Sequence, residues 1–205
     1  MYIIYNITDC VNHIIQRSIN NIRLGMTKIL AFVGMPASGK SLAASILGES
    51  GIKVVNMGDA IREEVVRRGL EPTDTNVGGV GTDLRNKEGK DAVAKRCISK
   101  IQAADSDLLV VDGVRSLAEI NCFKKIFGSD FTLVAIEAPL DTRFARVQAR
   151  KRSDDMSDID ALRVRDDREL GWGMGEAIAA ADIAIMNAGT LDEFRKKVLD
   201  MAGQA

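Results

Sequence analysis

The stretch FVGMPASGKS, residues 32–41, contains the spacing G-x-x-x-x-G-K-S from Gly34 to Ser41. Sequences of this kind form a wide turn whose backbone N–H groups point inward and surround a phosphate group. The two glycines permit backbone conformations that a side chain would block. The helix that follows directs the positive end of its dipole at the anion. We therefore predict a nucleoside triphosphate site at this turn.

Each residue of the turn has an expected role. Lys40 is expected to reach the β- and γ-phosphates as a catalytic cation, and the Ser41 hydroxyl is expected to be a ligand of Mg²⁺. The segment that holds the nucleotide is expected to comprise Gly34, Met35, Pro36, Ala37, Ser38, Gly39, Lys40 and Ser41. The guanine-reading sequence Asn-Lys-x-Asp does not occur in the chain, which favours ATP over GTP.

Apolar runs alternate with amphipathic segments along the rest of the chain. The apolar runs predict strands at residues 28–33, 52–56, 107–113, 131–138 and 182–187. The amphipathic segments predict helices at residues 41–49, 59–68, 90–103, 117–127, 141–152 and 191–201. The polar, glycine-rich stretch 71–86 is expected to be a mobile connection. Five alternations of strand and helix predict an α/β fold with a five-stranded parallel sheet and helices on both faces.

Residues 1–25 differ from the remainder of the chain. Their isoleucines and valine recur at helical spacing, so one interpretation is an extra helix docked on the domain. The other interpretation, which we favour, is an N-terminal extension outside a functional domain that spans residues 26–205. No sequence with phosphate chemistry precedes Met26, and the first predicted strand begins two residues after it.

Composition excludes several classes of protein. The 205 residues are 46% hydrophobic and carry a net charge of −1, without the basic excess typical of chains that bind nucleic acid. His13 is the single histidine, which excludes a histidine-based triad. The three cysteines lack metal spacing and favour the reducing cytoplasm. No apolar run approaches the roughly 18–20 residues that cross a bilayer.

Two arginines follow predicted strands at the edge where open α/β sheets bind ligands. Arg62 lies in the sequence GDAIR after the second strand, and Arg115 in DGVR after the third. An arginine fork makes paired hydrogen bonds to phosphate. Asp112 ends an apolar run and is expected to steady Mg²⁺ through water, with a helix cap or turn as the alternative. Asp59 is expected to cap a helix that begins at residue 60, with a minor alternative as the base for a hydroxyl acceptor.

These stretches resemble the adenylate-kinase-like nucleotide kinases, which have the P-loop NTPase fold. That family carries Gly-Asp-x-x-Arg after the second strand and Asp-Gly-Phe-Pro-Arg after the third, so the resemblance implies that Arg62 and Arg115 hold the phosphate of an acceptor. The family's Arg-x-x-x-Arg before the lid matches Arg146 and Arg150, which implies a catalytic role for both. The run from Arg163 to Asp167 loosely resembles the return side of the lid.

The tail ADIAIMNAGTLDEFRKKV looks like the ending of dephospho-coenzyme-A kinases. This combination of adenylate-kinase-like stretches with a dephospho-coenzyme-A-kinase-like tail is similar to an archaeal group of adenylate-kinase-related proteins. Segment 143–168 contains eight basic residues and six aspartates, and we predict a small lid at about residues 151–170, with a solvated charged helix pair as the alternative. Trp172 is either a hinge anchor or an ordinary packed tryptophan. Arg85 either covers the acceptor or is solvated.

The leading hypothesis is an ATP- and Mg²⁺-dependent kinase whose partner is a small phosphorylated acceptor, with a nucleoside monophosphate first. One alternative is a kinase for a hydroxyl acceptor such as dephospho-coenzyme A. The other alternative is an ATP-gated binding or assembly protein without a small acceptor.

Overall fold

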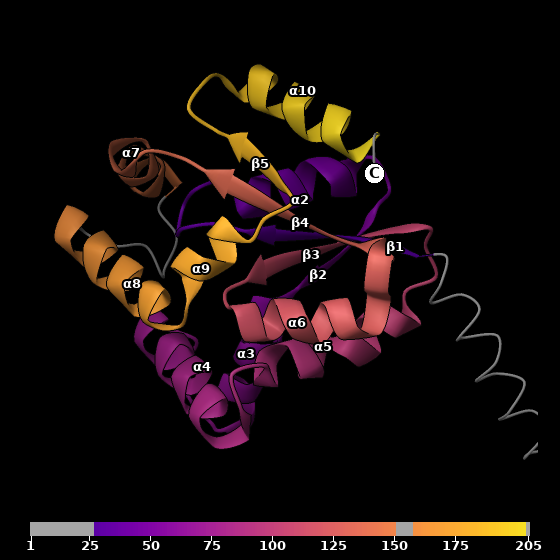
Figure 1. Ribbon diagram of the computed structural model, residues 1–205. Coiled ribbons are helices and arrows are strands. Elements are labelled where there is room, and N and C mark those ends of the chain that lie inside the picture. The colour runs from indigo at the N-terminus through magenta and orange to yellow at the C-terminus, as the bar shows by residue number, and fades with distance from the viewer. Residues whose placement is uncertain (1–26, 151–157, 204–205) are drawn as a thin grey trace, which may run out of the picture.

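The computed structural model describes residues 27–150 and 158–203. The predictions for residues 1–25 and for the first part of the lid, at residues 151–157, lie outside this range. Within it the chain forms a parallel β-sheet between two layers of helices (Figure 1).

The strand order is β2 (Lys53–Asn56), β3 (Leu108–Val114), β1 (Lys28–Val33), β4 (Phe131–Glu137) and β5 (Ile183–Met186). Every neighbouring pair is parallel. The apolar sequences of β1, β3 and β4 follow from their central position, because strands covered on both faces need no polar alternation. The predicted five-stranded parallel sheet is confirmed.

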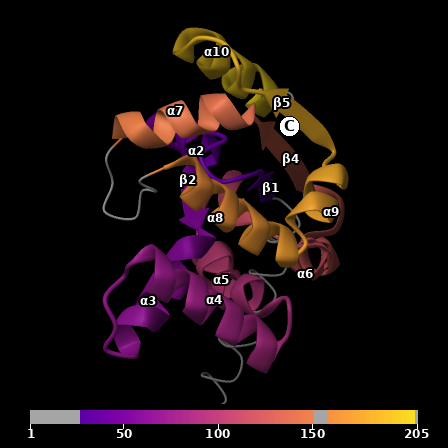
Figure 2. The ribbon, with the colours of Figure 1, turned by 90° about the vertical axis from the view of Figure 1, so that its left-hand side faces the viewer.

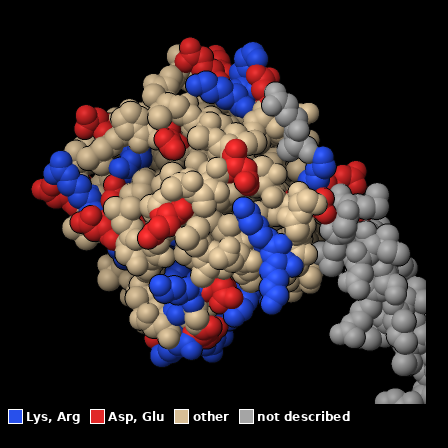
Figure 3. Space-filling view, in the orientation of Figure 1, with Lys and Arg blue, Asp and Glu red and all other residues tan. Residues whose placement is uncertain are grey.

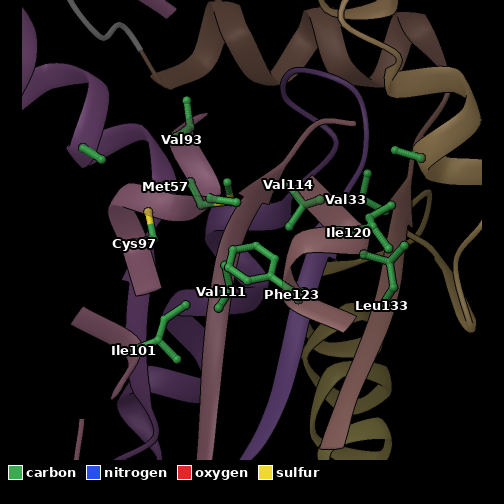
Figure 4. Close-up of a cluster of buried hydrophobic side chains, with 14 of the residues drawn as sticks. Val33, Met57, Val93, Cys97, Ile101, Val111, Val114, Ile120, Phe123 and Leu133 are labelled. Atoms are coloured by element: carbon green, nitrogen blue, oxygen red, sulfur yellow. The ribbon is translucent and has the colours of Figure 1, made fainter. Parts of the chain in front are cut away.

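Side chains of β1 alternate between two hydrophobic clusters, as the period of a strand requires. Leu30 and Phe32 pack toward α2 (Lys40–Glu49) and α10 (Leu191–Ala202). Ile29, Ala31 and Val33 point to the opposite face. That face is covered by α3 (Met57–Arg67), α5 (Ala92–Ala103) and α6 (Leu117–Phe127). Figure 4 shows part of this second cluster, in which Phe123 lies beside Val111 and Cys97 lies near Met57.

The expectation of a mobile connection at residues 71–86 was wrong, because Asp74–Glu88 forms helix α4. Thr73 caps it by accepting a hydrogen bond from the backbone N–H of Asn76. Glycine inside a helix costs about 1 kcal/mol relative to alanine, so propensity alone predicts a loop here. Close packing compensates. A Cβ at Gly78 would lie 2.7 Å from the Arg168 side chain, and a Cβ at Gly81 would lie 3.3 Å from Ile61.

Two further helices, α7 (Leu140–Arg150) and α8 (Ile159–Gly171), lie at the carboxyl ends of the strands. Helix α9 (Met174–Ala179) contributes Met174 and Ala177 to the second cluster, and a short 3₁₀ turn, η1 (Gly128–Asp130), precedes β4. The strand arrows in Figure 1 point toward α7 and α8, and Figure 2, which views the molecule from that side, shows α8 between α7 and α4. The site predicted at this edge of the sheet therefore lies beneath α8.

Charge is distributed over the surface in both signs. Figure 3 shows basic and acidic side chains interspersed on the face it presents, without a broad area of either sign. Within residues 27–150 and 158–203, no helix combines the length and apolarity that a membrane crossing requires.

Candidate active site

The phosphate loop, residues 34–40, connects β1 to α2 and depends on two glycines. Gly34 has a φ of +150°, and a Cβ there would lie 2.2 Å from the carbonyl oxygen of Ile136. Gly39 has a φ of +111°, and a Cβ there would lie 2.3 Å from Nδ2 of Asn187. Gly39 is the N-cap of α2, and no side chain caps this helix. The first N–H groups of α2 therefore face the loop, where they can bind an anion.

Side chains from distant segments hold the outer half of the loop. The Ser38 carbonyl accepts hydrogen bonds from Asn187 Nδ2 at 2.9 Å and from Arg146 Nη1 at 3.2 Å. Arg146 Nη2 also donates to the backbone and side-chain oxygens of Asn187, each at 2.9 Å. The Pro36 carbonyl accepts from Arg143 Nη1 at 3.1 Å. The loop is therefore fixed by α7 and by the residue that follows β5.

Arg146 lies on the nucleotide side of the site. With Ala37, Lys40, Ser41 and Asn187 it lines a cavity of about 340 Å³. Its partial burial lowers the pKa of its guanidinium. The other predicted arginine of α7, Arg150, is the last residue of the helix, and its side chain lies outside the described range.

Asp112 and Ser41 form the candidate Mg²⁺ site. Asp112 is only 3% exposed, and its Oδ2 accepts hydrogen bonds from Ser41 Oγ at 2.8 Å and from Asn56 Nδ2 at 3.4 Å. Its buried Oδ1 has no hydrogen-bond partner in the described chain. Mg²⁺ is commonly held by one or two protein side chains together with phosphates and water. The unpaired carboxylate oxygen beside the hydroxyl therefore fits Mg²⁺, with Ser41 and Asp112 as the residues that would hold it.

Lys40 lies inside the phosphate loop. Its Nζ donates to the carbonyl oxygens of Gly34 at 2.6 Å and Met35 at 3.0 Å. Burial lowers the pKa of this ammonium to about 8, although the negative charges of Glu169 and Asp112 act to raise it. A phosphate group would stabilise the charged form of Lys40 and raise its pKa again.

The lowered pKa of Lys40 predicts that nucleotide binding weakens at alkaline pH. Above pH 8 the free folded protein loses the Lys40 proton and must take it up again to bind phosphate. We expect the affinity for an ATP analogue with Mg²⁺ to fall about tenfold per pH unit above pH 8. Without nucleotide, the folded protein should gain stability between pH 8 and the ordinary value of 10.5, because only the unfolded chain keeps this proton there.

Calorimetric titrations at pH 6.5, 8 and 9, in two buffers of different ionisation enthalpy, measure the coupled protons directly. We expect nearly none at pH 6.5 and about half a proton taken up at pH 8. Proton uptake that is the same at all three pH values would show that Lys40 is not the group that titrates.

A second pocket, which we call the arginine pocket, encloses about 260 Å³. The two arginines predicted to bind the acceptor, Arg62 on α3 and Arg115 after β3, both line it. Two arginines of α8 complete it, and both pair with Asp74 of α4: Arg165 at 3.3 Å and Arg168 at 3.0 Å. Four guanidiniums therefore surround one small cavity, which is an arrangement suited to an anionic ligand.

The structure corrects the expected role of Asp59. Asn56 caps α3 by accepting a hydrogen bond from the N–H of Gly58 at 2.8 Å, and the helix begins at Met57. Asp59 lies within the first turn of α3, has a side chain that is 58% exposed, and pairs with Arg62 at 2.9 Å. Asp59 is therefore not a helix cap; it orients an arginine of the pocket.

Arg85 is neither solvated nor part of the pocket lining. It is 7% exposed, and its Nη2 donates to Glu119 Oε1 at 2.8 Å. Its guanidinium lies 4.6 Å from the centre of the Trp172 ring, which also contacts Arg115 at 5.3 Å and Arg168 at 5.7 Å. Trp172 is thus a packed residue that holds three cations by cation–π contacts and joins α4, α8 and the end of β3.

Sequence reasoning missed two residues that organise the site. Asn187 holds the phosphate loop; a polar side chain directly after the last strand, at the ligand-binding edge, was the available signal. Glu169 lies on α8, forms an ion pair with Arg115 and comes within 3.6 Å of Arg165. It was hidden within a charged segment whose other acids are mostly exposed.

Comparisons with known proteins agree with this architecture. The sequence model of a family described as an AAA domain matches residues 33–163. The UPF0200 protein of Methanosarcina acetivorans is 60% identical over 176 residues, which cover 86% of this chain and 94% of that protein. The UPF0200 protein of Methanosarcina barkeri is 62% identical over 174 residues, 85% of this chain and 94% of that one.

Solved structures share the fold at low sequence identity. TT1252 from Thermus thermophilus superposes with a TM-score of 0.59 at 16% identity and covers 87% of this chain and 97% of its own. Dephospho-CoA kinase from Campylobacter jejuni gives 0.54 at 15% identity, with the same coverage. A gluconokinase from Sinorhizobium meliloti gives 0.54 at 17% identity, covering 88% of this chain and 93% of its own. The described fold is therefore that of P-loop kinases.

Proposed function

We propose that this chain, which belongs to the UPF0200 family, is a kinase that transfers the γ-phosphate of ATP to a small phosphorylated acceptor. A nucleoside monophosphate is the leading acceptor. The observation that carries this proposal is the arginine pocket, since four guanidiniums beside a phosphate loop supply a second phosphate site. A protein that only hydrolyses ATP has no use for such a pocket.

The two sites lie at neighbouring strands. The phosphate loop follows β1 and Arg115 follows β3, and these strands pair directly, with Phe32 opposite Asp112. Ligands of open α/β sheets bind at this edge. The proposal therefore places donor and acceptor on either side of Lys40, as transfer in line between two oxygens requires.

In the proposed reaction this chain supplies position and charge. The loop N–H groups and Lys40 bind the donor phosphates, while Arg115 and Arg62 orient the acceptor. Ser41 and Asp112 would hold Mg²⁺, which supplies charge neutralisation on the donor phosphates. The arginines of α8 neutralise charge that spreads over the moving phosphoryl group, and α8 excludes water from the site.

Incubation with ATP, Mg²⁺ and a panel of acceptors tests this proposal, with products read by mass spectrometry and Lys40→Ala protein as the blank. We expect one nucleoside monophosphate to gain a phosphoryl group. Thermal shift should also show stabilisation by that monophosphate in addition to an ATP analogue.

Other outcomes would contradict the proposal in distinct ways. Phosphorylation of alcohols such as dephospho-coenzyme A, with none of the monophosphates, would replace the acceptor class. ATP hydrolysis that no small molecule in the panel alters, and that a protein partner stimulates, would indicate an ATP-gated assembly protein.

A further inference from the structure

Glu169 of α8 is a buried acid that pairs with arginines of the arginine pocket. Its carboxylate forms an ion pair with Arg115, and its Oε1 lies 3.6 Å from Arg165 Nε, so it touches two of the pocket's four arginines. Among charged groups, it also exerts the largest electrostatic effect on Lys40. One carboxylate therefore acts on the cations of both phosphate sites.

Glu169 carries a full negative charge in a place where charge is costly. The residue is 1% exposed, and its Oε2 has no hydrogen-bond partner within residues 27–150 and 158–203. Burial acts to raise its pKa, but the neighbouring cations, Arg115 first and Lys40 next, lower the pKa below its ordinary value. The carboxylate is thus held by the cations that a phosphate would use.

A bound phosphate competes with this carboxylate. Like charges repel strongly in a buried site because little water screens them. A phosphate on Lys40 withdraws one cation from Glu169 and adds a negative charge beside it. While Nη1 of Arg115 is paired with Glu169, only part of its fork is open to an acceptor phosphate, and release by Glu169 frees the whole fork.

The geometry also links α8, which carries Glu169, to the phosphate loop. Arg143 of α7 makes a paired contact with Asp166 of α8, at 2.9 and 2.6 Å, and donates to the Pro36 carbonyl. Gly173, with a φ of +98°, follows the C-terminal end of α8. A displacement of the loop therefore reaches the helix through one buried guanidinium.

We propose that Glu169 is an internal counter-anion of the arginine pocket that nucleotide phosphate displaces, so that nucleotide binding strengthens acceptor binding. Two geometric observations support this regulation. Glu169 pairs with Arg115 and Arg165. Its helix is tied to the phosphate loop by Arg143, which contacts both Asp166 and the Pro36 carbonyl. The regulation rests on the proposed function, because it assumes that both sites bind phosphate groups.

The test compares Glu169→Gln with Asp167→Asn, which makes the same neutralisation on the exposed side of α8. Calorimetry measures AMP binding with and without a non-hydrolysable ATP analogue and Mg²⁺. In the wild type and in Asp167→Asn we expect the analogue to tighten AMP binding by about tenfold or more. In Glu169→Gln we expect AMP to bind about tenfold tighter without the analogue, and the analogue to add less than about twofold.

Three results would overturn this proposal. The first is AMP affinity and coupling in Glu169→Gln equal to those of the wild type. The second is loss of transfer with both affinities unchanged, which would make Glu169 a base for a hydroxyl acceptor. The third applies if AMP does not bind, in which case inorganic pyrophosphate is the probe. Equal affinity of the wild type and of Glu169→Gln for pyrophosphate would then reject the role of Glu169 as a counter-anion.

Failure of the proposed function looks different, since the wild type would then transfer no phosphoryl group to any acceptor of the panel, whatever the affinities of Glu169→Gln. Thermal melting checks the fold of each variant. If Glu169→Gln is unfolded, Glu169→Met repeats the measurement, because it also removes the charge at a similar side-chain length.

Discussion

Lys40→Ala is expected to lower ATP-dependent transfer by about 10²–10³-fold or more, the scale seen when one group that stabilises transition-state charge is removed. Lys40 is the cation inside the phosphate loop, and its Nζ donates to the carbonyl oxygens of Gly34 and Met35. Its lowered pKa shows that the folded protein does not favour this charge, so its removal should leave the melting temperature nearly unchanged.

The measurement is initial rate under saturating acceptor, with thermal melting in parallel. Lys196→Ala, at an exposed position of α10, is the matched control and should behave as wild type. Turnover in Lys40→Ala within a few fold of wild type would exclude the phosphate-loop mechanism.

Arg115 is expected to act on the acceptor and not on ATP. A charged, paired contact to phosphate contributes roughly 1.5–3 kcal/mol, so its loss should weaken acceptor binding about 10- to 150-fold. Arg115→Ala alone would leave Glu169 buried without its ion-pair partner, which costs about 3–5 kcal/mol of stability. The double variant Arg115→Ala with Glu169→Gln removes both charges. Its affinity for the acceptor is compared with that of Glu169→Gln alone, so that the loss of Arg115 is measured without an unpaired buried carboxylate.

Arg115→Lys keeps the ion pair but loses the planar fork and the stacking on Trp172, so it should restore stability and not full affinity. Arg62→Ala should have a smaller effect than Arg115→Ala, since Arg62 is 47% exposed and already pairs with Asp59. Calorimetry with AMP and with an ATP analogue, titrated separately, measures both affinities. Arg67→Ala, on the exposed side of α3, is the control. Loss of ATP affinity with unchanged AMP affinity would show that the acceptor site is misplaced.

The sheet and the phosphate loop could be predicted because local rules determine them. Each strand contains a short run of apolar residues, and Gly34 and Gly39 are required by backbone conformations that allow no side chain. Helix 117–127 was predicted with the boundaries that the structure has, since Ser116 caps its start and Gly128 follows its end.

Helix α4 and the arrangement around Glu169 could not be predicted, because both depend on contacts distant in sequence. The glycines of α4 predict a loop from sequence alone. The structure shows that the side chain of Arg168, ninety residues after Gly78, packs against that glycine. The ion pair of Arg115 with Glu169 joins the end of β3 to α8, and no spacing in the sequence indicates that these two segments meet. Sequence spacing identifies residue types at a strand end, whereas the pairing of buried charges is decided by tertiary packing.

Asn187 has a consequence for biosynthesis. It lies 149 residues after Ser38, whose carbonyl it holds, so the loop encoded near the start of the domain has no C-terminal support until the last strand leaves the ribosome. At about 5–20 residues per second, that interval is roughly 8–30 s. β1, β3 and β4 can pair earlier, so a nascent chain passes through a stage with a formed sheet and an unsupported loop. We therefore expect nucleotide to stabilise the complete domain. It should not bind during the first steps of folding, because the supported loop forms only after them.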